Sequence, residues 1–183
     1  MERGLILKKG TIVDSTIISA PSSTKNKEKK RDPDAHQVKK GNTWHFGYKA
    51  HIGVDRDSGL VHTVEATAAN VHDATETSKL LTGDEDEVYG DSGYLGAEKR
   101  GDAIIRNKAG RKIKYRINRR PPQVKKLSKS GQYAAKKAEH AKSSVRAKVE
   151  HAFGVVKKQL RFRKTRYRGL EKQRAKFNIM FAL

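Results

Sequence analysis

Apolar and polar residues alternate through the first half of the chain in the manner of β-strands. Residues 10–18 are rich in β-branched side chains and apolar on both faces, which predicts a central strand. Residues 46–67 alternate on both sides of a turn at 55–59, which predicts an antiparallel hairpin. Short apolar runs predict two more strands, at 88–90 and 103–105.

Apolar positions three and four residues apart predict helices between and after these strands. Asp73 stands at the N-cap position of a helix expected over 74–81, and a short helix is expected to begin near Ala97. A long helix is predicted from about 132 to 163, and a final helix from Leu170 to the end of the chain. Strands and helices in this order predict a mixed α/β fold.

Two stretches rich in lysine and arginine interrupt the predicted elements. Residues 22–42 and 106–130 contain little apolar material, so we expect basic loops there. The total of 183 residues suits one domain with a sizeable core. We therefore expect a single domain over 1–183 that carries these two loops.

Charge and composition limit the classes of partner and of chemistry that the chain can have. The net charge is +21, and residues 92–183 hold 28 basic and 5 acidic residues against 13 and 15 in residues 1–91. Nucleic acid is the default partner of a chain this basic, although an acidic surface with a basic tail is an alternative. The absence of cysteine excludes disulfides, thiolate zinc sites and cysteine nucleophiles. No apolar stretch approaches the roughly 20 residues of a membrane span, so we expect a cytoplasmic protein without a membrane partner.

Three acidic residues stand out from their surroundings. Asp14 lies in a strand that is apolar on both sides, where a carboxylate needs a cation or donors; the alternative is a strand end capped by backbone amides. Asp91 follows an apolar strand, a common place for ligands, although Asp-Ser-Gly is also an ordinary turn. Glu150 lies beside the buried stripe of its helix, between Arg146 and Lys157, and could instead form a surface ion pair with Arg146.

Four segments and one helical motif carry a family resemblance. Residues 10–23, 44–55, 69–73 and 89–96 closely resemble bacterial insertion-sequence transposases of the family founded by insertion sequence five. The family's signature of Arg, three residues, Glu, six residues and Lys is met around Glu150, although serine stands where a tyrosine often precedes the arginine. The resemblance implies one RNase H-like catalytic domain, in which a mixed sheet with strands 1–3 antiparallel and later strands parallel is flanked by helices.

The resemblance also implies a chemistry. Asp14, Asp91 and Glu150 match the family's catalytic triad, which binds two Mg²⁺ ions, for which Mn²⁺ can substitute. Such a pair activates the attacking oxygen and stabilises the leaving oxygen in phosphodiester cleavage and strand transfer. The basic residues expected to hold DNA phosphates are Arg146, Lys157, Lys158, Arg161 and Arg163, extended by Lys164, Arg166 and Arg168. The implied partner is double-stranded DNA, both transposon ends and target, bound by a dimer or with a longer transposase chain at the bacterial nucleoid.

Several alternatives stay open at this point. Family members carry a helical region ahead of the first catalytic strand, so we expect a chain truncated at the N-terminus and also at the C-terminus. A catalytically dead DNA-binding remnant or inhibitor of full-length transposase is the alternative function, followed by a general nuclease or an RNA-binding protein. Trp44, Phe46 and Tyr94 are candidates for stacking on a flipped base, with core packing as the favoured alternative. The histidines lack the spacing of a helical zinc site.

Overall fold

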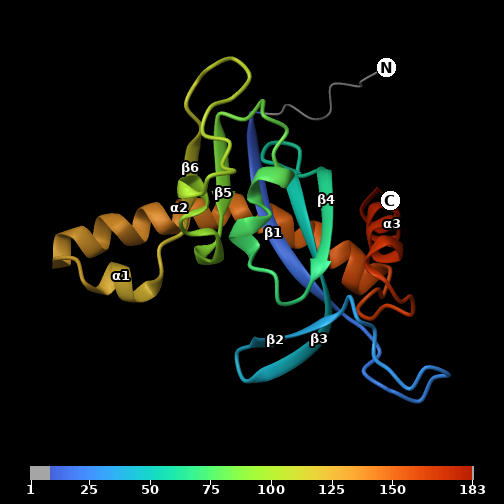
Figure 1. The fold of residues 1–183 in the computed structure, drawn as a ribbon. Coiled ribbons are helices and arrows are strands. Elements are labelled where there is room, and N and C mark those ends of the chain that lie inside the picture. Colours follow the sequence, from blue (N-terminus) through green and yellow to red (C-terminus); the bar gives the residue numbers. More distant parts are fainter. Residues whose placement is uncertain (1–8, 183) are drawn as a thin grey trace.

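A mixed β-sheet forms the centre of the computed structural model, which describes residues 9–182 (Figure 1). Its strands run in the order β2-β3-β1-β5-β6, and β4 also pairs with β3. Their bounds are Gly10–Ser19 for β1, His36–Lys40 for β2, Thr43–Asp55 for β3, Val61–Ala68 for β4, Glu87–Gly90 for β5 and Lys114–Ile117 for β6.

The strand directions make the sheet mixed. β3 is antiparallel to β1, β2 and β4, whereas β5 runs parallel to β1 and β6 runs parallel to β5. This arrangement is compatible with an RNase H-like fold, but it differs from the expected strand pattern because β2 is an additional antiparallel strand. β2 pairs with the first residues of β3, where β3 extends beyond the region covered by β4.

The core lies on both faces of β1, which explains its apolar character. Ile12 packs with Ile52, Val54 and Val149 on one face of the sheet. Val13 packs with a second cluster on the opposite face, which includes residues of β5 and the segment before β6. The expectation of a central strand is confirmed, and Asp14 shares the face of Ile12 because side chains alternate along a strand.

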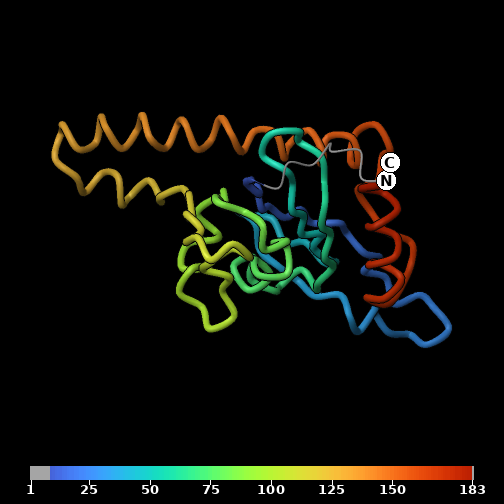
Figure 2. The backbone as a smooth tube through the Cα atoms, turned by 90° about the horizontal axis from the view of Figure 1, so that it is seen from above, coloured from blue at the N-terminus to red at the C-terminus, as the bar shows by residue number. Residues whose placement is uncertain are grey.

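Helices cover the sheet on the Ile12 side. The helix α2, Lys129–Gly154, contacts β1 and β5 and projects beyond the sheet at its N-terminal end, next to the short helix α1, Pro121–Lys125 (Figures 1 and 2). The helix α3, Leu170–Ala182, packs against β4. Its start at Leu170 is confirmed, and Leu183 lies outside the described residues. No helix in the described part of the chain is long and apolar enough to cross a bilayer.

Both predicted basic loops contain a strand, which corrects the sequence prediction. β2 lies within 22–42, and β6 lies within 106–130, whereas residues 103–105 form no strand. Lysines and arginines alternate with the apolar residues of β6, and this high charge hid the period-two pattern. Both strands lie at sheet edges, where charged side chains are common because they oppose further strand pairing.

The structure also corrects the predicted type and bounds of several helices. Two 3₁₀ turns, Asp73–Thr75 and Thr77–Leu80, replace the helix expected over 74–81, and His72 rather than Asp73 caps the first of them. The short helix near Ala97 is a single 3₁₀ turn. The long helix ends at Gly154 and continues as a π-helical turn, Val155–Gln159.

Candidate active site

The register of two parallel strands brings Asp14 and Asp91 together. The pairing of β1 with β5 ends at Ile12 and Tyr89, and each aspartate lies two residues beyond that pair. Equal offsets along neighbouring parallel strands place both residues side by side, just beyond the last β1–β5 pair, and on the same face of the sheet. The carboxyl ends of such strands are a common place for ligands in α/β proteins.

The Asp14 carboxylate is held close to one cation. Its Oδ1 accepts a hydrogen bond of 2.7 Å from the backbone N–H of Ser15, and its Oδ2 lies 3.5 Å from Nη2 of Arg146 on α2. Burial raises the pKa of Asp14 to about 6, against the lowering effects of the Ser15 N–H and Arg146; nearby Asp91 and Asp73 raise it further. A second cation at this carboxylate would therefore be favoured electrostatically.

Asp91 is oriented by the turn that follows β5. Its Oδ1 accepts a hydrogen bond of 2.7 Å from the N–H of Gly93, which caps the 3₁₀ turn Ser92–Tyr94. A Cβ atom on residue 93 would lie only 2.9 Å from that oxygen, so glycine permits the close approach. Asp91 can therefore both cap the turn and bind a ligand, because its carboxylate caps the turn through Oδ1 and also lines a cavity.

A third carboxylate, Asp73, belongs to the same site although the sequence analysis gave it no role in chemistry. Its Oδ1 accepts hydrogen bonds from Oγ of Ser15 at 2.7 Å and from Nζ of Lys49 at 3.0 Å. Burial opposes ionisation, but these donors hold the pKa of Asp73 below its ordinary value. Asp73 is the last residue of segment 69–73, one of the segments that carry the family resemblance. Its role in the site could not be predicted from local sequence, because its partners Ser15 and Lys49 lie on β1 and β3.

The three aspartates open into one cavity of about 220 Å³. Lys39 and Lys40 of β2 reach the same cavity, so the strand missed by the sequence analysis supplies cations beside the acids. The other residues that line it are Ser15, Ile17, Val38 and Lys49. A space lined by both carboxylates and lysines suits a phosphate group next to a cation.

Glu150 occupies a different place. It is exposed on α2, four residues after Arg146, and is not among the residues that line the cavity. Within residues 9–182, no group of three or more histidine or acidic side chains is arranged to hold a metal ion. The structure therefore brings Asp14 and Asp91 together and leaves Glu150 outside the cavity.

The chemistry of the two aspartates fits a divalent cation nonetheless. Carboxylate oxygens are the ligands that Mg²⁺ prefers, and Asp14 and Asp91 converge from adjacent strands. The hydroxyl of Tyr94 is buried and has no hydrogen-bond partner among the described residues. Its pKa is raised well above the ordinary value, first by burial and then by Asp14, Asp73 and Asp91. The site thus concentrates negative charge in a partly dehydrated place.

Lys157 and Arg163 form a basic cluster with Lys40 of β2. Burial and then the charges of Lys40 and Arg163 lower the pKa of Lys157. Nε of Arg163 donates a hydrogen bond of 3.1 Å to the carbonyl of Lys157. The backbone of Ser19 pairs with Arg163 and Thr165, which fixes this segment against the end of β1.

The other predicted DNA-binding residues have varied surroundings. Lys158 and Arg161 are exposed beside this cluster, and Arg161 adopts a left-handed backbone conformation with φ of 53°. Arg146 instead faces Asp14 and donates to the side chain of Asn118. Arg168 donates to Glu28 and to two backbone carbonyls, so it stabilises the loop before β2.

The three aromatic candidates differ in exposure. Tyr94 is 1% exposed and Phe46 is half-buried, which agrees with core packing. Trp44 is 63% exposed on the β2–β3 hairpin, so the expectation of core packing was wrong for this residue. The β2–β3 hairpin, which carries Trp44, extends past the rest of the sheet (Figure 1).

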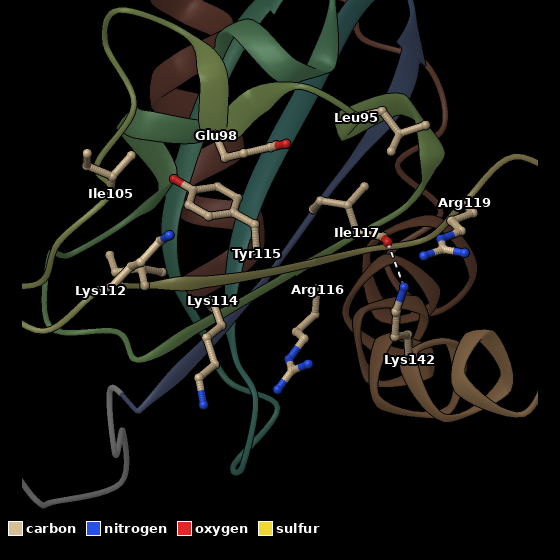
Figure 3. Close-up of a pocket in the computed structure, with 11 residues that line it drawn as sticks. Leu95, Glu98, Ile105, Lys112, Lys114, Tyr115, Arg116, Ile117, Arg119 and Lys142 are labelled. Atoms are coloured by element: carbon tan, nitrogen blue, oxygen red, sulfur yellow. Dashed lines mark hydrogen bonds between the residues drawn. The ribbon is translucent and has the colours of Figure 1, made fainter. Parts of the chain in front are cut away.

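A larger cavity of about 790 Å³ lies along β6 (Figure 3). Lys114 and Arg116 extend to the opposite side of the strand from Tyr115. Nζ of Lys142 on α2 donates a hydrogen bond of 2.9 Å to the carbonyl of Ile117. None of the three predicted catalytic acids lines this cavity. The larger size of this cavity therefore does not indicate a catalytic role.

A family model described as the transposase DDE domain matches residues 6–183. No solved structure matches the chain.

Proposed function

We propose, because the chain belongs to the transposase DDE domain family, that it cleaves DNA phosphodiesters and joins DNA strands at the ends of an insertion sequence. The observation that supports this most strongly is the convergence of Asp14 and Asp91 from two parallel strands in one lysine-lined cavity. We assign the element to the family founded by insertion sequence five, on the motifs described above.

Asp14 and Asp91 are the residues that would hold divalent cations, with Glu150 as the third acid of the proposed triad. Two Mg²⁺ or Mn²⁺ ions, when bound, activate an attacking oxygen and stabilise the leaving oxygen of a phosphodiester. The Ser15 and Gly93 amides fix the rotamers of the two aspartates before any ligand arrives. Arg146 stabilises the charged form of Asp14, because its Nη2 lies 3.5 Å from Oδ2 of that carboxylate.

The lysines and arginines around the cavity then hold the DNA backbone. Lys39 and Lys40 line the cavity itself, and Lys157 and Arg163 continue the positive surface from Lys40. Each neutralised phosphate releases counterions, so this surface supplies affinity without reading sequence. We propose double-stranded DNA as the substrate, two copies of the chain or a longer transposase acting on two ends, and the bacterial nucleoid as the place of action.

Cleavage of DNA that carries the element's terminal repeats tests the proposal. The purified chain is expected to nick such a plasmid with Mg²⁺ or Mn²⁺, and Asp14→Ala, Asp91→Ala and Glu150→Gln are each expected to lower the rate at least about a hundredfold. Asp102→Ala is the matched control, because its exposed carboxylate lies outside the cavity. Absence of nicking with both cations, or full activity of Asp14→Ala, would contradict the proposal.

A DNA-binding chain without catalysis is the second candidate, favoured by one observation. Glu150 lies outside the cavity, while Arg146 already neutralises part of the charge on Asp14. A binding remnant or an inhibitor of full-length transposase needs only the basic surface. It predicts salt-sensitive DNA binding that all three acid substitutions leave intact, together with no cleavage by the wild-type chain.

A further inference from the structure

We propose that Trp44 forms a stacking site for an unpaired base of the DNA strand whose backbone enters the carboxylate cavity. This inference rests on the proposed function, because it requires a DNA strand to be bound at the carboxylate cavity. It assigns a role to the β2–β3 hairpin, which the family resemblance left without one. It also commits to single-stranded DNA, as an unpaired end or a separated strand, as the occupant of the site.

The hairpin connects two cavities through one cross-strand pair. Lys39 lies directly opposite Trp44 in the register of β2 and β3, so both side chains occupy the same face of the hairpin. Lys39 lines the cavity of the three aspartates. Trp44 lines a second cavity of about 520 Å³, so the Lys39–Trp44 pair contributes one residue to each cavity.

The second cavity has the composition of a site for a nucleotide. Arg31 and Lys164 supply cations, and Arg31 also lies over the ring of Phe46, with 5.6 Å between its guanidinium carbon and the ring centroid. Lys164 is held there by pairing of its backbone with Ser19 at the end of β1. Gln37, on the same face as Trp44, provides a donor and an acceptor for a base edge. Aromatic surface with adjacent cations is the combination that single-strand binding proteins use.

Exposure of Trp44 also favours an unpaired base over duplex DNA. Inside a duplex each base is covered on both faces by its neighbours, whereas an unpaired base offers a free face to an indole. Stacking of one base on an aromatic side chain strengthens binding about tenfold. A base held by Trp44 would keep the two DNA strands separated, while the lysines of β2 hold the phosphates.

Trp44 is the sole tryptophan of the chain, so its fluorescence reports on this site alone. The full chain is titrated without divalent cations, using single-stranded DNA, a blunt duplex and a duplex with three unpaired nucleotides at one end. Binding is followed separately by anisotropy of a label on the DNA. We expect quenching by the single strand and by the unpaired end, and little quenching by a blunt duplex that binds equally well in the anisotropy assay.

Variants separate stacking from charge. Trp44→Ala is expected to weaken binding of the single strand about tenfold and to leave binding of the blunt duplex unchanged, whereas Trp44→Phe retains most of the affinity. Tyr133→Ala is the matched control, because Tyr133 is 76% exposed but lies on the distant part of α2. It is expected to change neither.

Three results would overturn the inference: unchanged fluorescence at DNA concentrations where anisotropy shows binding, equal quenching by the blunt duplex, or stronger quenching by RNA of the same sequence. None of these depends on cleavage. If Asp14→Ala retains the quenching while no variant cleaves DNA, the proposed catalytic function fails and the stacking site stands. If cleavage is intact and quenching is absent, only the stacking site fails.

Discussion

The charged form of Asp14 destabilises the fold that holds it. Burial raises the pKa of this carboxyl from 3.8 to about 6. Between about pH 4 and pH 6 the folded chain therefore keeps a proton that the unfolded chain has released, and stability falls as the pH rises through this window. The difference between the two values sets an upper limit of about 3 kcal/mol on the effect at neutral pH.

Asp14→Asn is accordingly expected to stabilise the chain at pH 8 when divalent cations are chelated. The melting temperature should rise by about 3–6 °C at pH 8 and by much less at pH 4, where Asp14 is already protonated. Thermal denaturation followed by circular dichroism measures both values. Asp102→Asn is the control, since that carboxylate is exposed and its pKa is lowered. Equal stabilisation by Asp14→Asn at the two pH values would show that its charge is not the cause.

Asp73 affects stability in the opposite direction, because it neutralises a buried lysine. Lys49 is 8% exposed, and its ammonium group donates to Asp73 Oδ1 and to the carbonyl of Val71. Asp73→Asn leaves that charge without its anionic partner, and we expect a loss of about 3 kcal/mol in urea denaturation. Lys49→Met in addition should restore most of the loss. A double variant as unstable as the sum of the single variants would contradict direct coupling.

At the scale of elements, the sequence predicted the strands that are rich in apolar residues and missed the strands that are charged. The alternation in β3 and β4 could be recognised because one face of each strand is apolar, whereas the polar residues Lys49, His51 and Thr67 on the other face are buried and hydrogen-bonded. In β2, by contrast, Val38 is the sole apolar residue, and β6 alternates Tyr115 and Ile117 with Lys114 and Arg116. Pairing with β3 makes β2 a strand although its own sequence shows no alternation, whereas β6, which pairs with β5, has a period-two pattern that its high charge obscured.

Close packing of β3 on β1 fixes where the hairpin leaves the sheet. A Cβ atom on residue 47 would overlap the carbonyl oxygen of Ile18 and would lie 2.9 Å from the backbone nitrogen of Ala20. Gly47→Ala is therefore expected to destabilise the chain by about 2–3 kcal/mol in chemical denaturation, because two backbone segments must move apart. Gly101→Ala, where nothing lies within 4 Å, is the control. Equal stability of the two variants would show that β3 does not need this contact.

At the scale of the whole molecule, the site divides into a part that the sequence could place and a part that it could not. The sequence predicted that Asp14 lies within a central strand and that Asp91 follows a later strand, and the family resemblance implied that the two residues meet. The position of Glu150 depends on how α2 rotates over the sheet, and that rotation is set by the packing of Val149 on Ile12 and by the reach of Arg146 to Asp14. A helical wheel places Glu150 beside the buried stripe but cannot say which part of the sheet lies opposite.

The uneven charge of the chain gives a prediction for DNA binding as a whole. If the cluster of Lys157 and Arg163 contacts phosphates directly, each contact contributes about 0.9 to the slope of log affinity against log salt concentration. The double variant Lys157→Ala and Arg163→Ala should then lower that slope by about 2, measured by anisotropy between roughly 50 and 200 mM salt. Lys136→Ala with Lys137→Ala removes the same charge from an exposed site on the projecting part of α2 and should leave the slope unchanged. Equal reductions by the two double variants would mean that DNA responds to net charge alone, and that the cluster beside the carboxylate cavity is not a defined path for the DNA backbone.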